Sequence, residues 1–311
     1  MKTLITGISG FIGFHLAKEL LIEGDSVIGF SRTNPESFKQ LSSKIQFIQA
    51  DLLEKAKIQK ILTEIKPDRI FHLAAQSLIP RSFENPQETI KINVIGTLNL
   101  LEEILALKLK TIFVSVGSSA EYGLTTRTRK PVSEDDLLLP QSPYGISKVV
   151  QHLFIQMYSR AYGLKGIHLR PFAVIGPLKK GDAVSDFVKS IVAIEQKKQK
   201  VIGVGNLEAV RDFIDIRDAV RAMILLSQEG KAGETYNICL GKGTSLTVVL
   251  GLLTKLAKTV IKIKKDPAKI RPLDDPVIIG DASKLQNLGF KPKYSLNQTL
   301  KNTLEYWRKQ I

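Results

Sequence analysis

The chain has 311 residues, 43% of them hydrophobic, and its mean hydropathy is +0.02. This balance excludes a disordered chain, which lacks the apolar area to offset the entropy of ordering, and the length predicts one large domain or two unequal ones. Lys and Arg outnumber Asp and Glu by 45 to 30, a formal net charge of +15 that raises the question of an anionic partner: nucleic acid, membrane surface or small polyanion. The single cysteine, Cys239, excludes a disulfide framework and a cysteine-built zinc site, and fits a reducing compartment.

Targeting and membrane signals are weak in this sequence. Gly7 breaks the N-terminal apolar run after a few residues, which is too short for the core of a signal peptide. No run of about eighteen apolar residues occurs, so we expect no transmembrane helix. The sequence predicts a soluble, cytoplasmic protein that does not bind a membrane.

The first half of the chain alternates short apolar runs with amphipathic stretches. We expect buried strands at 3–6, 26–30, 45–48, 69–74, 111–116 and 166–169. The three-to-four-residue apolar spacing of helices occurs near 11–23, 54–65, 88–107 and 146–162. Because right-handed crossovers between such strands give a parallel sheet with helices on both faces, the pattern predicts an α/β fold with a Rossmann-type doubly wound sheet.

The second half is less regular, and no Pro/Gly/Ser-rich linker separates it from the first. Helices are expected at 184–197, 216–228, 246–257, 281–287 and 296–309, and short strands at 200–202, 235–238 and 260–264. We therefore predict a nucleotide-binding domain over 1–170, to which part of 205–240 returns, and a smaller interleaved α/β substrate-binding lid over 171–311. Lysine clusters near 196–200 and 262–269 are expected to be solvated faces.

A glycine-rich segment, Gly7-Ile8-Ser9-Gly10-Phe11-Ile12-Gly13, follows the first strand and opens the first helix. The glycines at positions 7, 10 and 13 permit a tight turn, a close approach of backbone to phosphate, and close packing of helix on strand. The backbone of Phe11 and Ile12 then lies at a helix N-terminus, which presents free N–H groups to a pyrophosphate. The segment predicts a dinucleotide site, although its spacing is G-x-x-G-x-x-G rather than G-x-G-x-x-G.

The tip of the second strand indicates which dinucleotide is bound. A carboxylate about twenty residues after the glycines would bind a ribose 2′-hydroxyl and favour NAD, but here the strand ends Ser31-Arg32, and Asp25 precedes it. Arg32 can instead pair with a 2′-phosphate, so we expect NADP to be favoured over NAD. Asp51 and Leu52, after the third strand, are placed to meet the adenine.

The centre of the functional prediction is Tyr144 and Lys148, which are one helical turn apart on one face. A nearby ammonium favours the phenolate, so we expect Lys148 to lower the pKa of Tyr144 and allow proton exchange near neutral pH. Hydride transfer at a carbinol carbon needs such a group on the oxygen. Ser118 and Ser119 follow another expected strand, and a hydroxyl there can hydrogen-bond the same oxygen.

At this point the sequence resembles the extended short-chain dehydrogenase/reductase superfamily of nucleotide-sugar epimerases, dehydratases and reductases. The resemblance covers nearly the whole chain, and its closest likeness is to GDP-4-keto-6-deoxy-D-mannose reductases. It rests on the glycines at 7–13, Asp51-Leu52, Leu73-Ala74-Ala75-Gln76-Ser77, Asn93 with Gly96-Thr97, Ser118…Tyr122-Gly123, Ser142-Pro143-Tyr144…Lys148, Arg170-Pro171-Phe172, Arg211-Asp212-Phe213 and Arg271-Pro272.

The resemblance assigns further roles. Ser118 is the catalytic serine, four residues before the Tyr-Gly pair. Arg211 and Arg271 would clasp the diphosphate of a sugar nucleotide, for which planar, bidentate arginine is well suited. Cofactor contacts are implied for Leu73, Ala74, Ala75, Asn93 and Pro171, and substrate contacts for Ser77 and Ser119.

Two positions depart from the family pattern. The 4,6-dehydratases carry a glutamate two residues before the Tyr-Gly pair, where this chain has Ala120, and in an extended segment Glu121 would point the other way. Dehydration is therefore not expected. The asparagine that usually follows Arg-Pro-Phe is replaced by Ala173, which leaves the exact substrate open.

We expect an NADPH-dependent reductase that converts GDP-4-keto-6-deoxy-D-mannose to GDP-D-rhamnose. The alternative is a UDP-sugar 4-epimerase that keeps NAD bound between half-reactions, and a remote one is a non-catalytic dinucleotide-binding regulator, against which the intact Ser-Tyr-Lys set argues. We expect no nucleic-acid partner and no metal, since the four histidines lack ligand spacing. The resemblance implies a homodimer through the helices near 88–107 and 146–162, which carry the apolar residues Leu98, Leu101, Ile104, Val149, Leu153 and Met157.

Overall fold

A computed structural model describes residues 1–33, 44–128, 130–269 and 275–310. The chain forms two compact units, each assembled from separate segments. The first contains Met1–Gly123, Leu137–Pro171 and Val220–Asn237, and the second contains Leu124–Asp136, Phe172–Ala219 and Ile238–Ile311. The division places a boundary at Pro171, close to the residue where the sequence suggests one, and a later segment returns to the first unit. The sequence gives no hint that Leu124–Asp136 belongs with the second unit.

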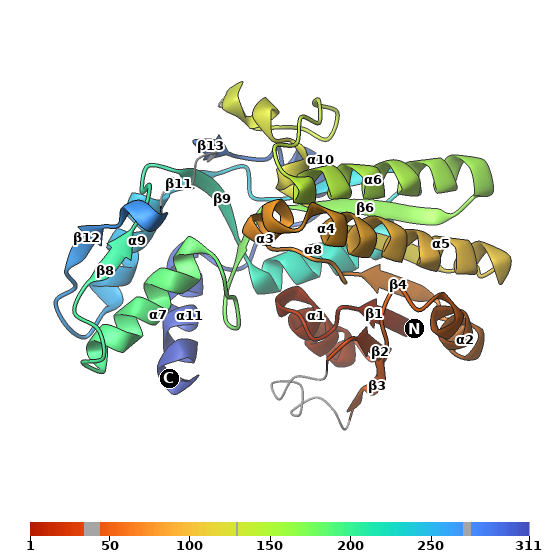
Figure 1. Cartoon of the computed structure of the whole chain (residues 1–311), viewed down its shortest axis with the longest axis horizontal. Helices are drawn as coiled ribbons and strands as arrows, with labels where there is room; N and C mark the ends of the chain where they lie inside the picture. The colour runs from red at the N-terminus through yellow and green to blue at the C-terminus, as the bar shows by residue number, and fades with distance from the viewer. Residues whose placement is uncertain (34–43, 129, 270–274, 311) are drawn as a thin grey trace. The chain divides into compact units, whose positions relative to one another are not determined.

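The first unit is built on a seven-stranded sheet with the order β10-β6-β5-β4-β1-β2-β3. Its strands are β1 (Lys2–Thr6), β2 (Ser26–Ser31), β3 (Gln46–Gln49), β4 (Arg69–His72), β5 (Ile112–Val116), β6 (Lys165–Pro171) and β10 (Thr235–Ile238). The pairs from β3 through β6 are all parallel, for example Thr3 opposite Val27 and Arg69 (Figure 1). The expected Rossmann-type doubly wound sheet is confirmed, and all these strands present their carboxyl ends at one edge.

Helices cover this sheet, and the apolar faces predicted from sequence form its core. They include α1 (Phe11–Ile22), α2 (Lys55–Ile65), α5 (Gly96–Ala106) and α6 (Pro143–Tyr162). One cluster of buried residues joins strands β1, β2, β4 and β5 to α2, α5 and α6, and includes Leu4, Ile70, Leu100, Phe113 and Ile155. Burying such side chains contributes about 1.5–3 kcal/mol each before the entropy of ordering is counted.

The helix expected near 88–107 is present as one continuous helical run, made of α4 (Pro86–Ile90), a π-helical turn over Lys91–Ile95, and α5. A separate short helix, α3 (Ile79–Glu84), precedes it. Pro86 cannot continue a preceding helix, and the Asn85 side chain accepts a hydrogen bond from the Glu88 N–H, which caps the new one. The wider π turn places Asn93 toward the interior, where it is buried.

The second unit contains a smaller sheet around β9 (Val210–Asp215), which pairs with β7 (Ala173–Ile175), β11 (Gly243–Ser245) and β13 (Val277–Ile278). These four strands were not predicted, since they are short and β9 carries Arg211, Asp212 and Asp215 among its apolar residues. Buried Asp212 accepts backbone N–H bonds from Leu240, Gly241 and Gly280, so a carboxylate rather than apolar contact ties the neighbouring loops to this strand.

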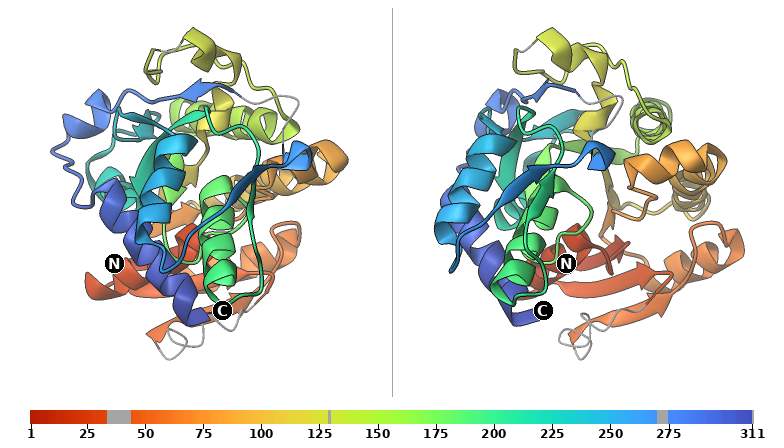
Figure 2. Two further views of the ribbon diagram at one scale, coloured as in Figure 1. Left: turned by 90° about the vertical axis from the view of Figure 1, so that its left-hand side faces the viewer. Right: turned by 60° about the vertical axis from the view of Figure 1, so that its left-hand side comes forward.

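Helices α7 (Ala183–Glu195), α9 (Leu246–Leu256) and α11 (Leu296–Gln310) pack together in the second unit (Figure 2). Their apolar faces share one core that includes Phe187, Ile191, Leu250 and Trp307. Two further strands, β8 (Ile202–Val204) and β12 (Ile263–Lys265), pair in parallel beside it. The short helix α10 (Ser283–Gln286) and α8 (Ile216–Glu229) complete the described elements, and α8 carries the chain from the second unit into the first. Within the described residues no helix is long and apolar enough to cross a membrane.

Candidate active site

Six of the predicted cofactor and catalytic residues of the first unit lie at the carboxyl edge of the parallel sheet. Each follows or ends a strand: Gly7 comes after β1, Arg32 after β2, Asp51 after β3, Leu73 after β4, Ser118 after β5, and Pro171 ends β6. In open α/β sheets this edge, beside the strand where the order reverses, is where ligands bind. The sheet therefore brings together residues that span more than half of the sequence.

Gly7, Gly10 and Gly13 differ in what a side chain at each position would contact. Gly7 has φ +71°, and a Cβ on it would lie 2.7 Å from the Ala74 backbone nitrogen. A Cβ on Gly13 would lie 2.5 Å from the Gly7 carbonyl oxygen, so Gly13 allows α1 to pack on the turn. A Cβ on Gly10 would meet only the Gly7 oxygen, at 3.2 Å. The tight turn therefore requires Gly7, and the packing of α1 on that turn requires Gly13. The absence of a side chain at Gly10 leaves open space.

This open space fits a dinucleotide. Gly10 is the N-cap of α1, and no side chain caps that helix end. The first N–H groups of a helix carry a partial positive charge and suit a pyrophosphate. Phe11 and Ile12, half-buried, lie in this first turn. The segment after β4 is half-buried beside Gly7 and forms a partly exposed surface next to the turn; it consists of Leu73, Ala74 and Ala75.

Asn93 departs from its expected cofactor role. Its Oδ1 accepts the Gln76 N–H at 2.7 Å, and its Nδ2 donates to the Gln76 carbonyl at 3.0 Å and to Ser147 Oγ at 2.9 Å. Both amide protons are thus used inside the protein, and Asn93 is 1% exposed. The residue clamps the loop after β4 to α6, so it supports the cofactor edge and the catalytic helix instead of offering a donor to a ligand.

The remaining predicted cofactor residues differ in what they offer a ligand. The Arg32 side chain is exposed, as pairing with a 2′-phosphate requires. Half-buried Asp51 accepts the Leu53 N–H at 3.0 Å, which turns the chain after β3. Leu52 is 4% exposed and its side chain belongs to the core, so only its backbone can face an adenine. Pro171 is buried at the end of β6.

Helix α6 positions the predicted catalytic pair. Ser142 is its N-cap and accepts the Gly145 N–H at 3.0 Å, and Pro143 occupies the first turn, where a missing N–H costs nothing. Tyr144 and Lys148 follow one turn apart and are 8% and 3% exposed. The Lys148 Nζ atom lies 5.9 Å from the centre of the Tyr144 ring. The spacing read from sequence is therefore realised on one face of a capped helix.

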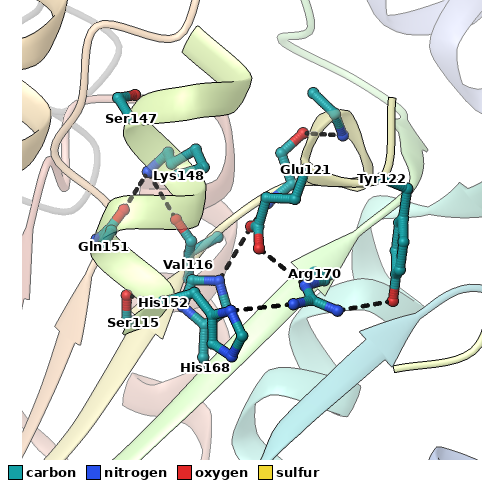
Figure 3. Close-up of polar contacts among 12 residues, drawn as sticks. Ser115, Val116, Glu121, Tyr122, Ser147, Lys148, Gln151, His152, His168 and Arg170 are labelled. Atoms are coloured by element: carbon teal, nitrogen blue, oxygen red, sulfur yellow. Dashed lines mark hydrogen bonds and ion pairs between the residues drawn. The ribbon is translucent and has the colours of Figure 1, made fainter. Parts of the chain in front are cut away.

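Lys148 is held by two acceptors in the first unit. Its ammonium donates to the Val116 carbonyl and to Gln151 Oε1, both at 2.8 Å (Figure 3). Burial lowers the pKa of Lys148 to about 8, and the charge of Glu121 opposes that shift. An ammonium has three protons, so two fix the group and the third fits a ribose hydroxyl of a bound cofactor.

Tyr144 is a neutral phenol in this structure, contrary to the expectation that Lys148 lowers its pKa. Burial raises the pKa of Tyr144 to about 12, the Glu121 charge raises it further, and a side-chain hydrogen bond with Ser118 lowers it. Two protons of the Lys148 ammonium are donated to Val116 and Gln151, and burial is the largest contribution to the raised pKa of Tyr144. Ser118 therefore acts on the Tyr144 hydroxyl, and a protonated phenol is the form that donates a proton.

Glu121 is not one of the reacting groups, but the reason predicted from the sequence, that it lies in an extended segment and points the other way, is wrong. The residue is in a 3-10 turn (Ser119–Glu121), not in an extended segment. Its fully buried carboxylate receives His168 Nε2 at 3.0 Å and Arg170 Nε at 2.8 Å. Ala120, at the position of the dehydratase glutamate, has no group that transfers a proton. The pairing of Glu121 with His168 and Arg170 was not predicted, and the available signal was His168 inside the apolar run 166–169 with Arg170 directly after it.

The remaining predicted substrate residues are divided between the two units. Ser77 is exposed after β4, and Ser119 is half-buried beside Ser118. Arg211 lies on β9 in the second unit, where its Nη1 donates to the carbonyls of Val210 at 2.9 Å and Asp275 at 2.8 Å. Arg271 lies outside the described residues.

Comparisons with known proteins identify the family of the chain. A family model described as GDP-mannose 4,6 dehydratase matches residues 4–303. GDP-6-deoxy-D-mannose reductase of Pseudomonas aeruginosa is 28% identical over 100% of this chain and 98% of that protein. UDP-glucose 4-epimerase of Mycolicibacterium smegmatis is 32% identical over 99% of each. The solved structure of RMD from Pseudomonas aeruginosa complexed with NADPH superposes with a TM-score of 0.86 at 27% identity, covering 100% of both chains.

The parallel sheet, the glycine turn and the Ser-Tyr-Lys set define a nicotinamide-dinucleotide-dependent enzyme of the extended short-chain dehydrogenase/reductase class. Within that class, the chain belongs to the GDP-mannose 4,6-dehydratase family. The family name does not fix the reaction, because the relatives include a reductase and an epimerase.

Proposed function

We propose that this protein is a cytoplasmic, NADPH-dependent reductase of GDP-4-keto-6-deoxy-D-mannose that forms GDP-D-rhamnose. The observation that carries the proposal is the pairing of a neutral Tyr144 phenol with Ser118 beside Ala120. A ketone reduction needs a proton donor and a hydrogen-bond donor at the carbonyl oxygen. It does not need the carboxylate that a dehydration requires at position 120.

The chemistry divides between cofactor and protein. Bound reduced nicotinamide supplies the hydride that adds to C4 of the keto sugar. Tyr144 donates the phenolic proton to the developing C4 alkoxide, while Ser118 hydrogen-bonds the same oxygen and orients it. Lys148 holds the nicotinamide ribose, and its positive charge stabilises the phenolate left after proton transfer. Solvent then returns one proton to Tyr144.

The substrate groups are assigned on chemistry. Arg211 and Arg271 are proposed to bind the diphosphate, and Ser77 and Ser119 the sugar. Arginine suits a diphosphate because its fixed fork of donors matches two phosphate oxygens. The second unit, over most of 171–311, is the proposed sugar-nucleotide domain.

A homodimer through α5 and α6 is also proposed. Ile146 and Leu153 on α6 are 46% and 52% exposed, and Ile95 before α5 is 44% exposed, which suits an apolar interface. Leu101 and Ile104, which the sequence offered for this role, lie in the core. No nucleic-acid partner is proposed.

The experiment is a spectrophotometric assay of NADPH oxidation with GDP-4-keto-6-deoxy-D-mannose. We expect turnover by the native protein and a loss of about 10²-fold or more in kcat for Tyr144→Phe, which removes the proton donor. Tyr162→Phe, an exposed residue at the end of the same helix, is the matched control and should retain activity. Absence of turnover would overturn the proposal.

The second candidate is a UDP-sugar 4-epimerase, which the 32% identity to the Mycolicibacterium smegmatis enzyme favours. It would use the same Ser118, Tyr144 and Lys148 but retain NAD between half-reactions. NAD that co-purifies tightly, together with conversion of UDP-glucose to UDP-galactose and no net oxidation of NADPH, would establish it in place of the reductase.

A further inference from the structure

The carboxylate of Glu121 is the centre of a polar cluster buried in the first unit, which we call the Glu121 cluster: Glu121, His168, Arg170, His152 and Tyr122. Glu121, His168 and Arg170 are each 0% exposed. Glu121 Oε1 receives the His168 ring and Oε2 receives Arg170 Nε, as Figure 3 shows. These partners lower the pKa of Glu121 to about 2 although burial alone would raise it, so the group is a carboxylate.

Arg170 closes the other side of the cluster. Its Nη1 donates to the Tyr122 hydroxyl at 3.0 Å, and its Nη2 lies 3.1 Å from His152 Nδ1. Tyr122 in turn donates to Asn237 Oδ1 at 2.7 Å. The guanidinium also lies 4.8 Å from the centre of the Tyr122 ring. Glu121 is therefore fixed in position by an arginine that has a partner on each of its three guanidinium nitrogens.

The same carboxylate holds the catalytic serine. Glu121 Oε1 accepts the Ser118 N–H at 2.9 Å, the Glu121 N–H donates to the Ser118 carbonyl at 3.1 Å, and Ser118 Oγ accepts the Ala120 N–H at 3.1 Å. This reciprocal arrangement is a capping box. Because Ser118 Oγ accepts from Ala120, its own proton is left to point elsewhere, toward Tyr144 or a substrate oxygen.

Glu121 also acts on Lys148 through its charge. Burial favours the neutral amine, and the Glu121 carboxylate opposes this by favouring the ammonium. His72 on β4 and His168 on β6 also interact electrostatically with Lys148, but burial lowers the pKa of both rings, to about 3 for His72, so they are neutral. Tyr144, on the same helix, is a neutral phenol, and the charge of Arg170 is paired with Glu121.

We propose that Glu121 is a positioning residue for the reaction, which holds Ser118 in place through its backbone N–H. The same buried carboxylate is expected to favour the ammonium form of Lys148. Arg170 and His168 hold Glu121. This inference rests on the proposed function for its kinetic effect, but its electrostatic part concerns the protein alone. The role at Lys148 predicts a change in the pKa of Lys148, and the role at Ser118 predicts a loss of kcat. An ion pair with a purely structural function predicts neither change.

The first test measures Lys148 directly and needs no substrate. In protein labelled with [ε-13C]lysine, NMR titration between pH 6 and 10.5 gives the pKa of Lys148, whose signal is assigned by its absence in Lys148→Met. Glu121→Gln removes the carboxylate and leaves Arg170 unpaired, so the pKa of Lys148 should fall by roughly half a unit or more. Glu64→Gln, an exposed carboxylate on α2, should leave it unchanged. An unchanged pKa of Lys148 in Glu121→Gln would overturn the electrostatic role of Glu121.

The second test separates charge from geometry with Glu121→Asp, which also covers the case in which Glu121→Gln does not fold because a buried charge is unpaired. The shorter side chain keeps the charge and loses reach to Ser118, so the pKa of Lys148 should stay near the native value. With NADPH and GDP-4-keto-6-deoxy-D-mannose, kcat should fall about tenfold while the KM for NADPH is unchanged, since the Glu121 side chain is fully buried and its acceptors are used inside the protein. A native value of kcat in Glu121→Asp would contradict the proposed role of Glu121 in holding Ser118.

The NMR titration and the kinetic assay can fail independently of each other. If the native protein does not turn over the GDP-linked keto sugar, the proposed function fails, and the NMR titration still decides whether Glu121 sets the charge of Lys148.

Discussion

Burial sets the protonation states of both residues of the Tyr144–Lys148 pair. In water a tyrosine and a lysine four residues apart would both be protonated and would differ little from many exposed pairs. Here burial raises the pKa of Tyr144 to about 12 and lowers that of Lys148 to about 8. The two shifts have opposite signs because burial disfavours the charged form of each group. The pair therefore holds a proton on the phenol at neutral pH and keeps an ammonium only up to about pH 8.

Gly10→Ala tests whether Gly10 is kept open for the pyrophosphate. Its φ of −78° suits alanine, and the added Cβ would meet only the Gly7 oxygen, at 3.2 Å, so the fold should survive. The methyl group occupies the approach to the helix N-terminus, so the Kd for NADPH, measured by fluorescence titration, should rise about tenfold or more. Gly251→Ala, which has open space and lies in α9, is the control. Native affinity in Gly10→Ala would place the pyrophosphate elsewhere.

Arg32→Ala tests the choice of cofactor. An exposed guanidinium at the tip of β2 can pair with a 2′-phosphate that NADH lacks. The substitution should raise the KM for NADPH about tenfold and leave the KM for NADH nearly unchanged. Equal effects on both cofactors would show that Arg32 does not read the 2′-phosphate.

At the scale of elements, the site depends on short connections between strands and helices. The 3-10 turn Ser119–Glu121 joins β5 to the site, and α6 begins with a capped first turn. Gly117, the last residue before Ser118, is buried where a Cβ would overlap both the Glu121 carboxylate and the His168 ring. The end of β5, the turn and β6 therefore fit together only with glycine at this position.

Gly117→Ala should destabilise the protein by about 1–3 kcal/mol, the usual cost of forcing atoms into a packed core. Urea unfolding followed by circular dichroism measures this difference. Gly251→Ala is again the matched control and should be neutral, or stabilising by about 0.5–1 kcal/mol, because alanine is the better helix former. Equal stability of Gly117→Ala and the native protein would contradict the packing described.

At the scale of the whole molecule, buried neutral histidines link stability to pH. Burial lowers the pKa values of His72 and His152 to about 3, and His168 shifts in the same direction. His72 has a partner on each ring nitrogen, Thr6 Oγ1 at 2.8 Å and Thr97 Oγ1 at 2.9 Å. Since Thr97 donates its own proton to the Asn93 carbonyl, it accepts from His72 Nε2–H, and the neutral tautomer is satisfied.

The unfolded chain therefore binds more protons than the folded chain between pH 6.5 and about 3. Stability should be fully present above pH 6.5 and fall as the pH drops, by at most about 1.4 kcal/mol per pH unit for each histidine. Urea unfolding at several pH values between 4.5 and 7 gives this slope. His72→Gln should reduce it by about one histidine's share, and an identical slope in the variant would mean that His72 titrates alike in both states.

The local pattern of the sequence was enough to predict the parallel sheet, the glycine turn, and the Tyr144–Lys148 spacing. These features depend on residues close together in the chain: apolar runs that must be buried on both faces, glycines that a tight turn requires, and a spacing of four that one helical turn sets. For the same reason, the ends of the apolar runs were enough to predict that Arg32 and Asp51 lie at the carboxyl edge of the sheet.

What only the tertiary structure decided were interactions between distant segments. Asn93 became a clamp because a π turn brings its amide to Gln76 and Ser147, 17 and 54 residues away in sequence. The strand β9 could not be recognised because its Asp212 carboxylate finds backbone donors in loops some thirty to seventy residues later. The state of Tyr144 and the partners of Glu121 depend on burial and on charges from three separate elements. Local spacing specifies which groups are available, and packing decides their charge and their partners, because desolvation and pairing act only when the chain has folded.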